Sequence, residues 1–221
     1  MDRHFDDELE ELKNDLLEMA NIADRAIRKA TEALIAADVS MAEAVILGDR
    51  RLNELENRVE GFAIDLLARR QPLACDLRFI TTALSLNSEL ERIGDLAVNI
   101  AQRAIEVSVH KKDIVFVDTP RLAERAGAMV KRAIESFVTN DAVKAQAVIG
   151  EDELADELRN KITDDMKENY LKKDPSSVDW AVALILVARH LERICDHATY
   201  IAQDVIYLTE ARNVKHAHNP K

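Results

Sequence analysis

Hydrophobic residues recur along this chain at the three- and four-residue spacing of an α-helix. Leu90, Ile93, Ala97 and Ile100 form one apolar stripe of this kind, and residues at such spacing share one helix face. No window of the sequence combines alternating β-branched residues with the paired turn signals of a hairpin. The pattern therefore predicts an all-α protein.

Short polar or proline-containing breaks divide this pattern into six helices. Gln71-Pro72-Leu73 ends the second one, because proline cannot continue a helix interior, and Thr119 is expected to be the N-cap of the fourth. The predicted helices span residues 6–37, 41–70, 75–109, 120–139, 141–171 and 177–210.

The six helices form two copies of one unit. Residues 90–105 and 191–206 share ten of sixteen positions at a shift of 101, and upstream identities such as Asp49 with Asp152 continue the match at a shift of 103. We therefore expect two tandem three-helix bundles related by internal duplication, in an elongated molecule. The expected boundaries are a first repeat at 1–109, a linker at 110–118, a second repeat at 119–211 and a disordered tail at 212–221.

Composition supports helix and excludes several classes of protein. The chain is 48% apolar but only 4% aromatic, with five Gly and four Pro in 221 residues. Its longest apolar run, 181–188, is too short to span a bilayer, and a formal net charge of -11 argues against nucleic-acid binding. Cys75 and Cys195 are single cysteines within predicted helices, which favours reduced thiols in the cytoplasm.

The duplicated segments also carry paired acids that lie off the apolar stripes. Glu91 and Asp95 are four residues apart on one helix face, and the preceding helix carries Asp49 and Asn53 at the same spacing. Antiparallel neighbours would bring these polar edges together at a seam, in each copy. The eight candidate ligands are Asp49, Asn53, Glu91, Asp95, Asp152, Asp156, Glu192 and Asp196.

Clusters of carboxylate and carboxamide oxygens suit hard or intermediate cations. Divalent or trivalent ions are therefore the expected cofactors, with iron, Mn, Mg, Ca and Zn all left open. The alternative is an ordinary solvated face with exposed ion pairs. A di-iron oxidase of the ferritin type is disfavoured, because such sites use Glu-x-x-His pairs in the bundle interior and no His here follows a Glu by three residues.

The doubled Leu-Glu-Arg-Ile-x-Asp-x-Ala segments, together with Pro-Leu-Ala-x-Asp-Leu-Arg at 72–78, resemble the PhoU family of phosphate-regulation proteins. The similarity covers residues 5–210. It implies that Glu91 with Asp95, Glu192 with Asp196, and Asp152 with Asp156 match the family's metal motif. The first copy departs from that motif at Asn53, a neutral and weaker ligand, so we expect its site to hold fewer ions or to hold them less tightly.

The same resemblance implies a cytoplasmic, commonly homodimeric regulator rather than an enzyme. Such a protein would act with the phosphate ABC transporter ATPase and a sensor histidine kinase, keep the phosphate-starvation response off, and modulate phosphate uptake. It would meet the membrane only through these partners, and Arg92 and Arg193 are candidate partner-binding residues. A metal-storage or metal-dependent bundle protein is the alternative, and a purely structural scaffold is the third hypothesis.

Overall fold

A computed structural model describes residues 3–113 and 117–214, and the part described is helical throughout its regular elements. The first repeat contains three long helices, α1 (Arg3–Ala36), α2 (Val39–Arg70) and α3 (Ala74–Val107), followed by a 3-10 helix at Ser108–Asp113. The second repeat contains α4 (Thr119–Thr139), α5 (Ala142–Ile149), α6 (Asp152–Asp165) and α7 (Val178–Glu210), with a π-helical turn at Met166–Leu171 and a short 3-10 turn at Pro175–Ser177.

The predicted all-α class and the duplicated three-helix bundles are confirmed, but two local predictions are wrong. Thr119 lies inside α4, and the residue before the helix is Asp118. The fifth predicted helix, 141–171, is interrupted at Gly150 and Glu151, which form a turn between α5 and α6. Residues 114–116 of the predicted linker and 215–221 of the predicted tail lie outside the described residues.

Equivalent aspartates start the middle helix of each repeat. The side chain of Asp38 accepts a hydrogen bond from the backbone N–H of Met41, and Asp141 accepts from the N–H groups of Val143 and Lys144. Each bond satisfies a donor that the first turn of a helix leaves without a partner. The corner before each helix is therefore fixed by the same residue type in both copies.

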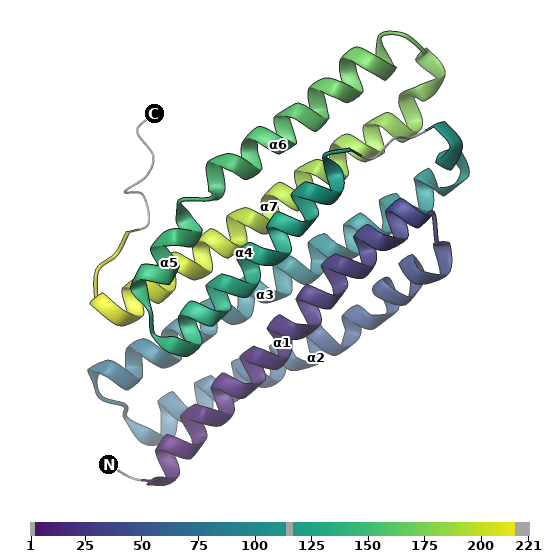
Figure 1. Cartoon of the computed structure of the whole chain (residues 1–221). Helices are drawn as coiled ribbons and strands as arrows, with labels where there is room; N and C mark the ends of the chain where they lie inside the picture. The colour runs from purple at the N-terminus through teal and green to yellow at the C-terminus, as the bar shows by residue number, and fades with distance from the viewer. Residues whose placement is uncertain (1–2, 114–116, 215–221) are drawn as a thin grey trace.

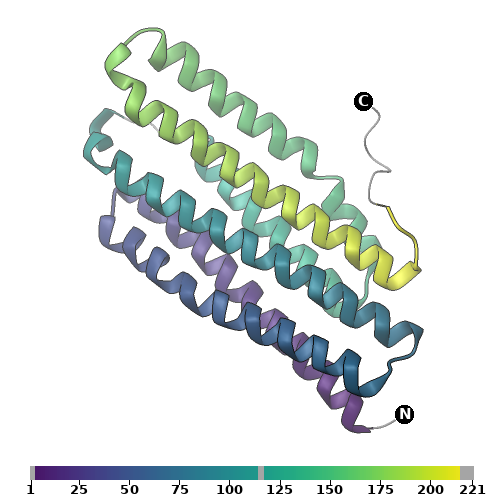
Figure 2. The ribbon, with the colours of Figure 1, turned by 180° about the vertical axis from the view of Figure 1, so that it is seen from behind.

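The two bundles lie side by side with their long axes nearly parallel, which gives the elongated shape that the sequence predicts (Figure 1). Seen from behind, α3 and α7 run next to each other through the middle, with α2 and α6 on the outer edges (Figure 2). On the opposite side α1 packs against α4. Helices α3 and α7 are thus the central pair of the molecule. None of the described helices is long and apolar enough to cross a membrane.

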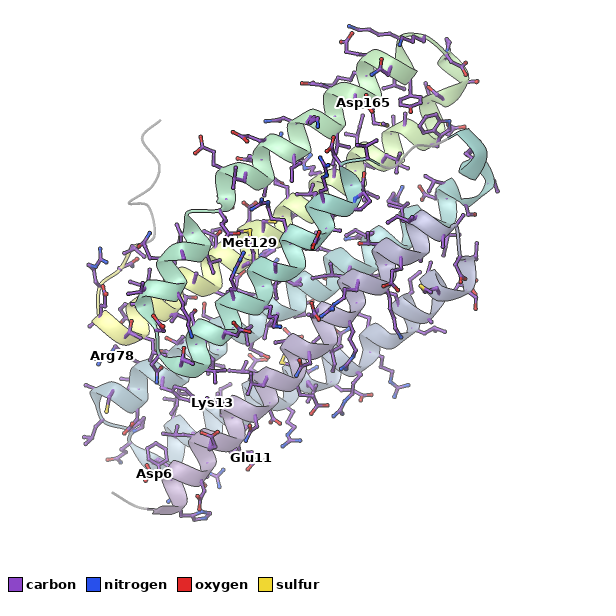
Figure 3. All side chains as sticks on the ribbon, viewed as in Figure 1. Asp6, Glu11, Lys13, Arg78, Met129 and Asp165 are labelled. Atoms are coloured by element: carbon purple, nitrogen blue, oxygen red, sulfur yellow. The ribbon has the colours of Figure 1, made fainter. Side chains whose placement is uncertain are left out.

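One continuous hydrophobic core runs through both bundles. It is made largely of Leu, Ile, Val and Ala side chains from helices α1 to α7, and Trp180 and most of the apolar run 181–188 belong to it. Figure 3 contrasts Met129, which is fully buried on α4, with Glu11 and Asp165, which lie on the outside. Continuity of the core makes the two repeats one packed unit.

Polar contacts also cross the α3–α7 interface, which is otherwise largely apolar. The Ser85 hydroxyl donates to Asp204 Oδ2 at 2.5 Å, and His197 Nδ1 lies 2.5 Å from Glu89 Oε2. Both Asp204 and His197 are buried. Since buried polar groups are costly without partners, these contacts fix how one repeat sits on the other.

Where the second and third helices of a repeat pack together, the large and the small side chain lie on opposite helices in the two copies. In the first repeat Gly94 faces Leu52 so closely that an added Cβ would collide with the Leu52 side chain. The equivalent positions in the second repeat hold Cys195 and Ala155, both fully buried. In the first repeat the small residue is on α3 and the large one on α2. In the second repeat the larger residue is on α7 and the small one on α6.

Candidate functional site

The predicted acids of the first repeat line the seam between α2 and α3. We call this the first acidic seam and define it as Asp49, Asn53, Glu56, Glu91 and Asp95. Asn53 Nδ2 donates to Asp49 Oδ2 at 3.0 Å, while Asn53 Oδ1 is buried and has no hydrogen-bond partner among the described residues. A buried amide oxygen in an acidic seam is suited to accept a cation.

Burial and mutual repulsion favour protonated carboxyls in this seam. Burial raises the pKa of Glu91 to about 7, and the negative charges of Asp95 and Glu56 add to the shift. The pKa of Asp49 is raised by burial and by Asp95, against a lowering hydrogen bond from Asn53. The pKa of Glu56 is raised by burial and by the charges of Glu60 and Asp95. The seam therefore disfavours full ionisation of its carboxyls, and a bound cation would relieve the repulsion between the ionised forms.

The predicted acids of the second repeat line the seam between α6 and α7. This second acidic seam comprises Asp152, Asp156, Arg159, Glu192 and Asp196. Burial raises the pKa of Asp196 to about 7, and the charges of Glu192, Asp152 and Asp156 raise it further. The Thr199 hydroxyl donates to Asp152 Oδ1 at 3.4 Å. The four predicted ligands of this repeat therefore lie together, as do those of the first.

An arginine already balances part of the charge in the second acidic seam. Arg159 Nη2 lies 2.9 Å from Asp156 Oδ1 and 3.3 Å from Glu192 Oε1, so it bridges α6 and α7. Burial raises the pKa of Glu192, and the nearby Arg159 opposes that shift. The second acidic seam thus contains its own cation.

The residue equivalent to Arg159 in the first repeat is Glu56, so the charge is reversed at this position, in addition to the change from Asn53 to Asp156. The first acidic seam has four carboxylates and an amide, and the second has four carboxylates and a guanidinium. Sequence reasoning missed both residues because it followed positions that the repeats share. The available signal was spacing, since Glu56 lies seven residues after Asp49 on the same helix face.

The side chains of the seams do not converge into a finished coordination shell. Within residues 3–113 and 117–214, no group of three or more His, Cys, Asp or Glu side chains is placed so that it could hold one metal ion. The acids are near enough to shift one another's pKa values, and Asp95 is exposed to solvent. Binding an ion would therefore require carboxylate side chains to change rotamer.

The candidate partner-binding arginines lie on the surface. Arg92 and Arg193 are both exposed, on α3 and α7, and each follows a glutamate of an acidic seam. Arg92 lowers the pKa of Glu91, and neither arginine forms an ion pair within 4.0 Å in the described part of the chain. Both side chains are accessible to another protein.

Two other titratable groups near the second acidic seam, Cys195 and His190, lie in surroundings typical of packed side chains. Burial, together with nearby carboxylates, raises the pKa of the Cys195 thiol. Burial lowers the pKa of His190, and Arg103, Arg193 and Arg189 lower it further. Neither group carries the features of an activated nucleophile or base.

Comparison with known proteins identifies the family. The family model described as PhoU domain matches residues 16–104 and 119–205, one copy in each repeat. The chain belongs to the PhoU family. A PhoU homolog from Aquifex aeolicus, described as a phosphate-specific transport system accessory protein, is 40% identical over 211 residues, which cover 96% of this chain and 95% of that protein. The homolog from Pseudomonas aeruginosa is 34% identical over 220 residues, covering 97% and 88% of the two chains.

Solved PhoU structures share the whole architecture. The crystal structure of PhoU from Pseudomonas aeruginosa superposes with a TM-score of 0.90 at 33% sequence identity, covering 94% of this chain and 100% of that one. The phosphate transport system regulatory protein PhoU from Streptococcus pneumoniae gives a TM-score of 0.88 at 26% identity, covering 95% and 99%. The resemblance proposed from the doubled motif is thereby confirmed.

Proposed function

We propose that this PhoU-family protein is an accessory regulator of phosphate transport. The observation that carries the proposal is kinship along the whole chain, since relatives that match 95% of it or more are phosphate-specific transport system accessory proteins. A protein that covers nearly the full length of such relatives retains both of their repeats. Their names do not favour the metal-storage alternative.

The proposed mechanism is that of an adaptor in the cytoplasm, without catalysis. The protein would join the ATPase of the phosphate ABC transporter to a sensor histidine kinase, hold the phosphate-starvation response off when phosphate is abundant, and restrain uptake. The exposed arginines Arg92 and Arg193 support this role, because arginine is a frequent anchor in protein interfaces. A homodimer would present two copies of each surface.

We further propose that the acidic seams bind metal ions. Carboxylate oxygens and the unpartnered Asn53 Oδ1 fit a hard or intermediate cation, whose charge would offset the repulsion within each seam. Glu56 joins the proposed ligands of the first acidic seam, and Arg159 competes with metal in the second. The first seam is therefore proposed as the stronger site, which reverses the expectation based on Asn53 alone.

Deletion of the gene tests the regulatory role. Without an off-switch, alkaline phosphatase and other phosphate-starvation genes should be expressed in phosphate-rich medium, and a wild-type copy should restore repression. Normal repression in the deletion strain would refute the regulatory proposal.

Charge reversal at the two arginines tests the partner surface. Arg92→Glu with Arg193→Glu should fail to restore repression and should lose the kinase or the ATPase in a pull-down, because a displayed cation is replaced by an anion. The matched control is Arg50→Glu, an exposed arginine on α2 whose partner is Glu54. If both variants restore repression equally well, the two arginines are not partner contacts.

Sedimentation of the wild-type protein tests the proposed homodimer.

A further inference from the structure

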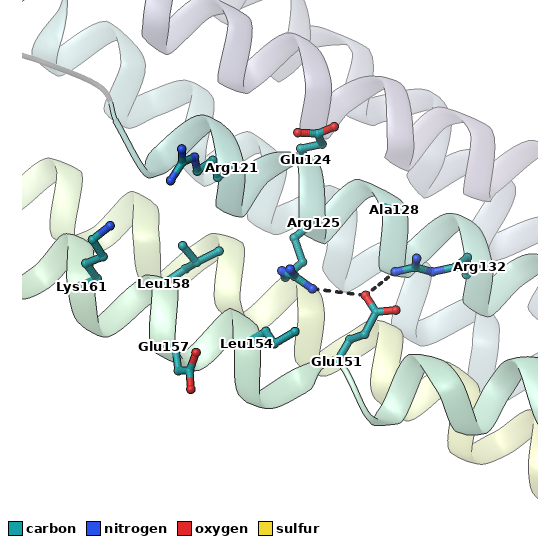
Figure 4. Close-up of a pocket in the computed structure, with 10 residues that line it drawn as sticks. All are labelled: Arg121, Glu124, Arg125, Ala128, Arg132, Glu151, Leu154, Glu157, Leu158 and Lys161. Atoms are coloured by element: carbon teal, nitrogen blue, oxygen red, sulfur yellow. Dashed lines mark hydrogen bonds and ion pairs between the residues drawn. The ribbon is translucent and has the colours of Figure 1, made fainter.

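A groove of about 600 Å³ opens between α4 and α6 (Figure 4). Four cations line it, Arg121, Arg125, Arg132 and Lys161, in a chain whose net charge is -11. At one end Asp118 pairs with Lys161 at 2.9 Å and with Arg121 at 3.3 Å. The two remaining arginines stand further along α4, at the level of the break between α5 and α6.

Both of these arginines hold the same carboxylate oxygen. Arg132 Nη2 lies 2.5 Å and Arg125 Nη1 3.3 Å from Glu151 Oε2, and Figure 4 shows Glu151 pointing between the two guanidinium groups. Glu124 and Glu157 also line the groove, but their carboxylates point away from Glu151 and the two arginines in this view. One internal monoanion therefore sits between two cations.

The two guanidinium groups have donors that Glu151 does not use. The Nε atoms of Arg125 and Arg132 are buried and have no hydrogen-bond partner among the described residues. An arginine binds an oxyanion best through two parallel N–H groups, and a tetrahedral dianion offers several oxygens and a charge equal to that of two arginines. Because Glu151 offers both arginines the same oxygen, its single negative charge does not balance their two positive charges, and some of their N–H donors stay unused.

The first repeat provides an internal comparison, because it lacks this arrangement. The residues equivalent to Arg125, Arg132 and Glu151 are Ile22, Lys29 and Gly48, and they line the corresponding smaller groove of about 280 Å³ between α1 and α2. Helix α2 also continues unbroken through Gly48. The paired arginines, the internal carboxylate and the helix break thus occur together, and only in the second repeat of the described structure.

We propose that Arg125 and Arg132 form a binding site for a phosphate-type dianion, for which Glu151 is the resident and displaceable substitute. The dianion is either free inorganic phosphate or the phosphoryl group of a phosphorylated side chain, since both present the same oxygens. The site depends only on the groove and does not rest on the proposed regulatory function.

Calorimetric titration of the full-length protein tests this site, with sodium phosphate and O-phosphoserine as separate probes at constant ionic strength and mildly alkaline pH. We expect one site per chain. Arg132→Gln should weaken binding at least about tenfold, because it removes a charge-assisted donor pair, and Glu151→Gln should tighten binding because it removes the competing carboxylate. Preference for one probe identifies the source of the dianion.

The matched control is Lys29→Gln, which removes the equivalent cation of the first repeat and should leave the affinity unchanged. Arg125→Gln provides a second test of the pair, and circular dichroism of each variant confirms that the helices are retained. Failure of wild type and Glu151→Gln to bind either probe would overturn the proposal, as would binding that both arginine variants leave intact.

Discussion

Glu91 and Asp196 are the residues whose ionisation is shifted most toward neutrality among the seam acids. Burial raises both pKa values to about 7, from 4.5 for Glu91 and 3.8 for Asp196. The folded protein therefore holds protons that the unfolded chain releases at lower pH. Their contribution to stability is complete below the unfolded pKa values and is lost as the pH rises toward 7.

We expect the metal-free protein to become less stable between about pH 4.5 and pH 7 through these two carboxyls. Glu91→Gln with Asp196→Asn should flatten that part of the profile, because neither amide can ionise. Urea unfolding in the presence of a chelator, repeated across this range, measures the effect. Glu54→Gln, an exposed control on α2, should keep the wild-type slope. A double variant with the wild-type slope would contradict the assignment.

The reversed charge at Glu56 and Arg159 predicts opposite responses to substitution. Glu56→Gln should weaken Mn²⁺ binding by roughly tenfold, since it removes a negative charge from the first acidic seam. Arg159→Gln should strengthen binding by the second acidic seam, because Asp156 and Glu192 lose their internal cation. Electron paramagnetic resonance of Mn²⁺ titrations measures both affinities.

Controls for this pair are available on the surface of α2. Glu54→Gln and Arg50→Gln remove one partner each from an exposed ion pair outside the seams and should leave Mn²⁺ binding as it is. Equal affinities in the Glu56→Gln and wild-type proteins would exclude Glu56 as a ligand.

At the scale of the element, the packing of α2 against α3 depends on the absence of a side chain at Gly94. Gly94→Cys, which copies the second repeat, should destabilise the protein by about 1–3 kcal/mol, because buried Leu52 must move. Leu52→Ala alone should cost about 2–5 kcal/mol by leaving a cavity.

The double variant copies both residues of the second repeat and should cost clearly less than the sum of the single changes. Chemical denaturation of the four proteins gives the coupling energy of this cycle. Strict additivity would mean that Gly94 and Leu52 do not constrain each other.

Most of the helices could be predicted because their ends depend on local chemistry. Gln71-Pro72-Leu73 separates α2 from α3 as expected, since proline cannot continue a helix interior. The break at Gly150 could not be predicted in this way, because Gly48 lies within an unbroken α2 at nearly the same place in the first repeat. The second repeat has Glu151 where the first has Gly48, and two arginines of α4 hold Glu151 in place.

The candidate site shows the same division. Acids at spacing four on consecutive helices were enough to predict that Asp49 and Glu91 share a seam, because antiparallel helices in a bundle are neighbours. The roles of Arg159 and of the groove beside Glu151 depend on which side chains face each other across helices. The net charge of -11 describes the whole chain and gives no indication that two arginines lie side by side at the groove.

For the whole molecule, the continuous core predicts that both repeats unfold together. Differential scanning calorimetry should give one transition whose calorimetric and van't Hoff enthalpies agree, although the sequence reads as two units. Glu89→Ala should lower the midpoint of that single transition, because it leaves His197 buried without its partner. Two separate transitions in the wild-type protein would show that the repeats are independent.

Trp180 is the only tryptophan of the chain, and it lies buried at the start of α7 with the Tyr170 ring edge-on at 4.8 Å. Tryptophan fluorescence excited selectively therefore reports on one end of the second repeat, and the first repeat contributes no tryptophan signal. The substitution Phe62→Trp, at a partly buried aromatic position on α2, would place a fluorescent reporter in the first repeat. Combined with Trp180→Phe, this change leaves a single tryptophan in the first repeat, so the variant and the wild-type protein together report the unfolding of the two repeats one at a time.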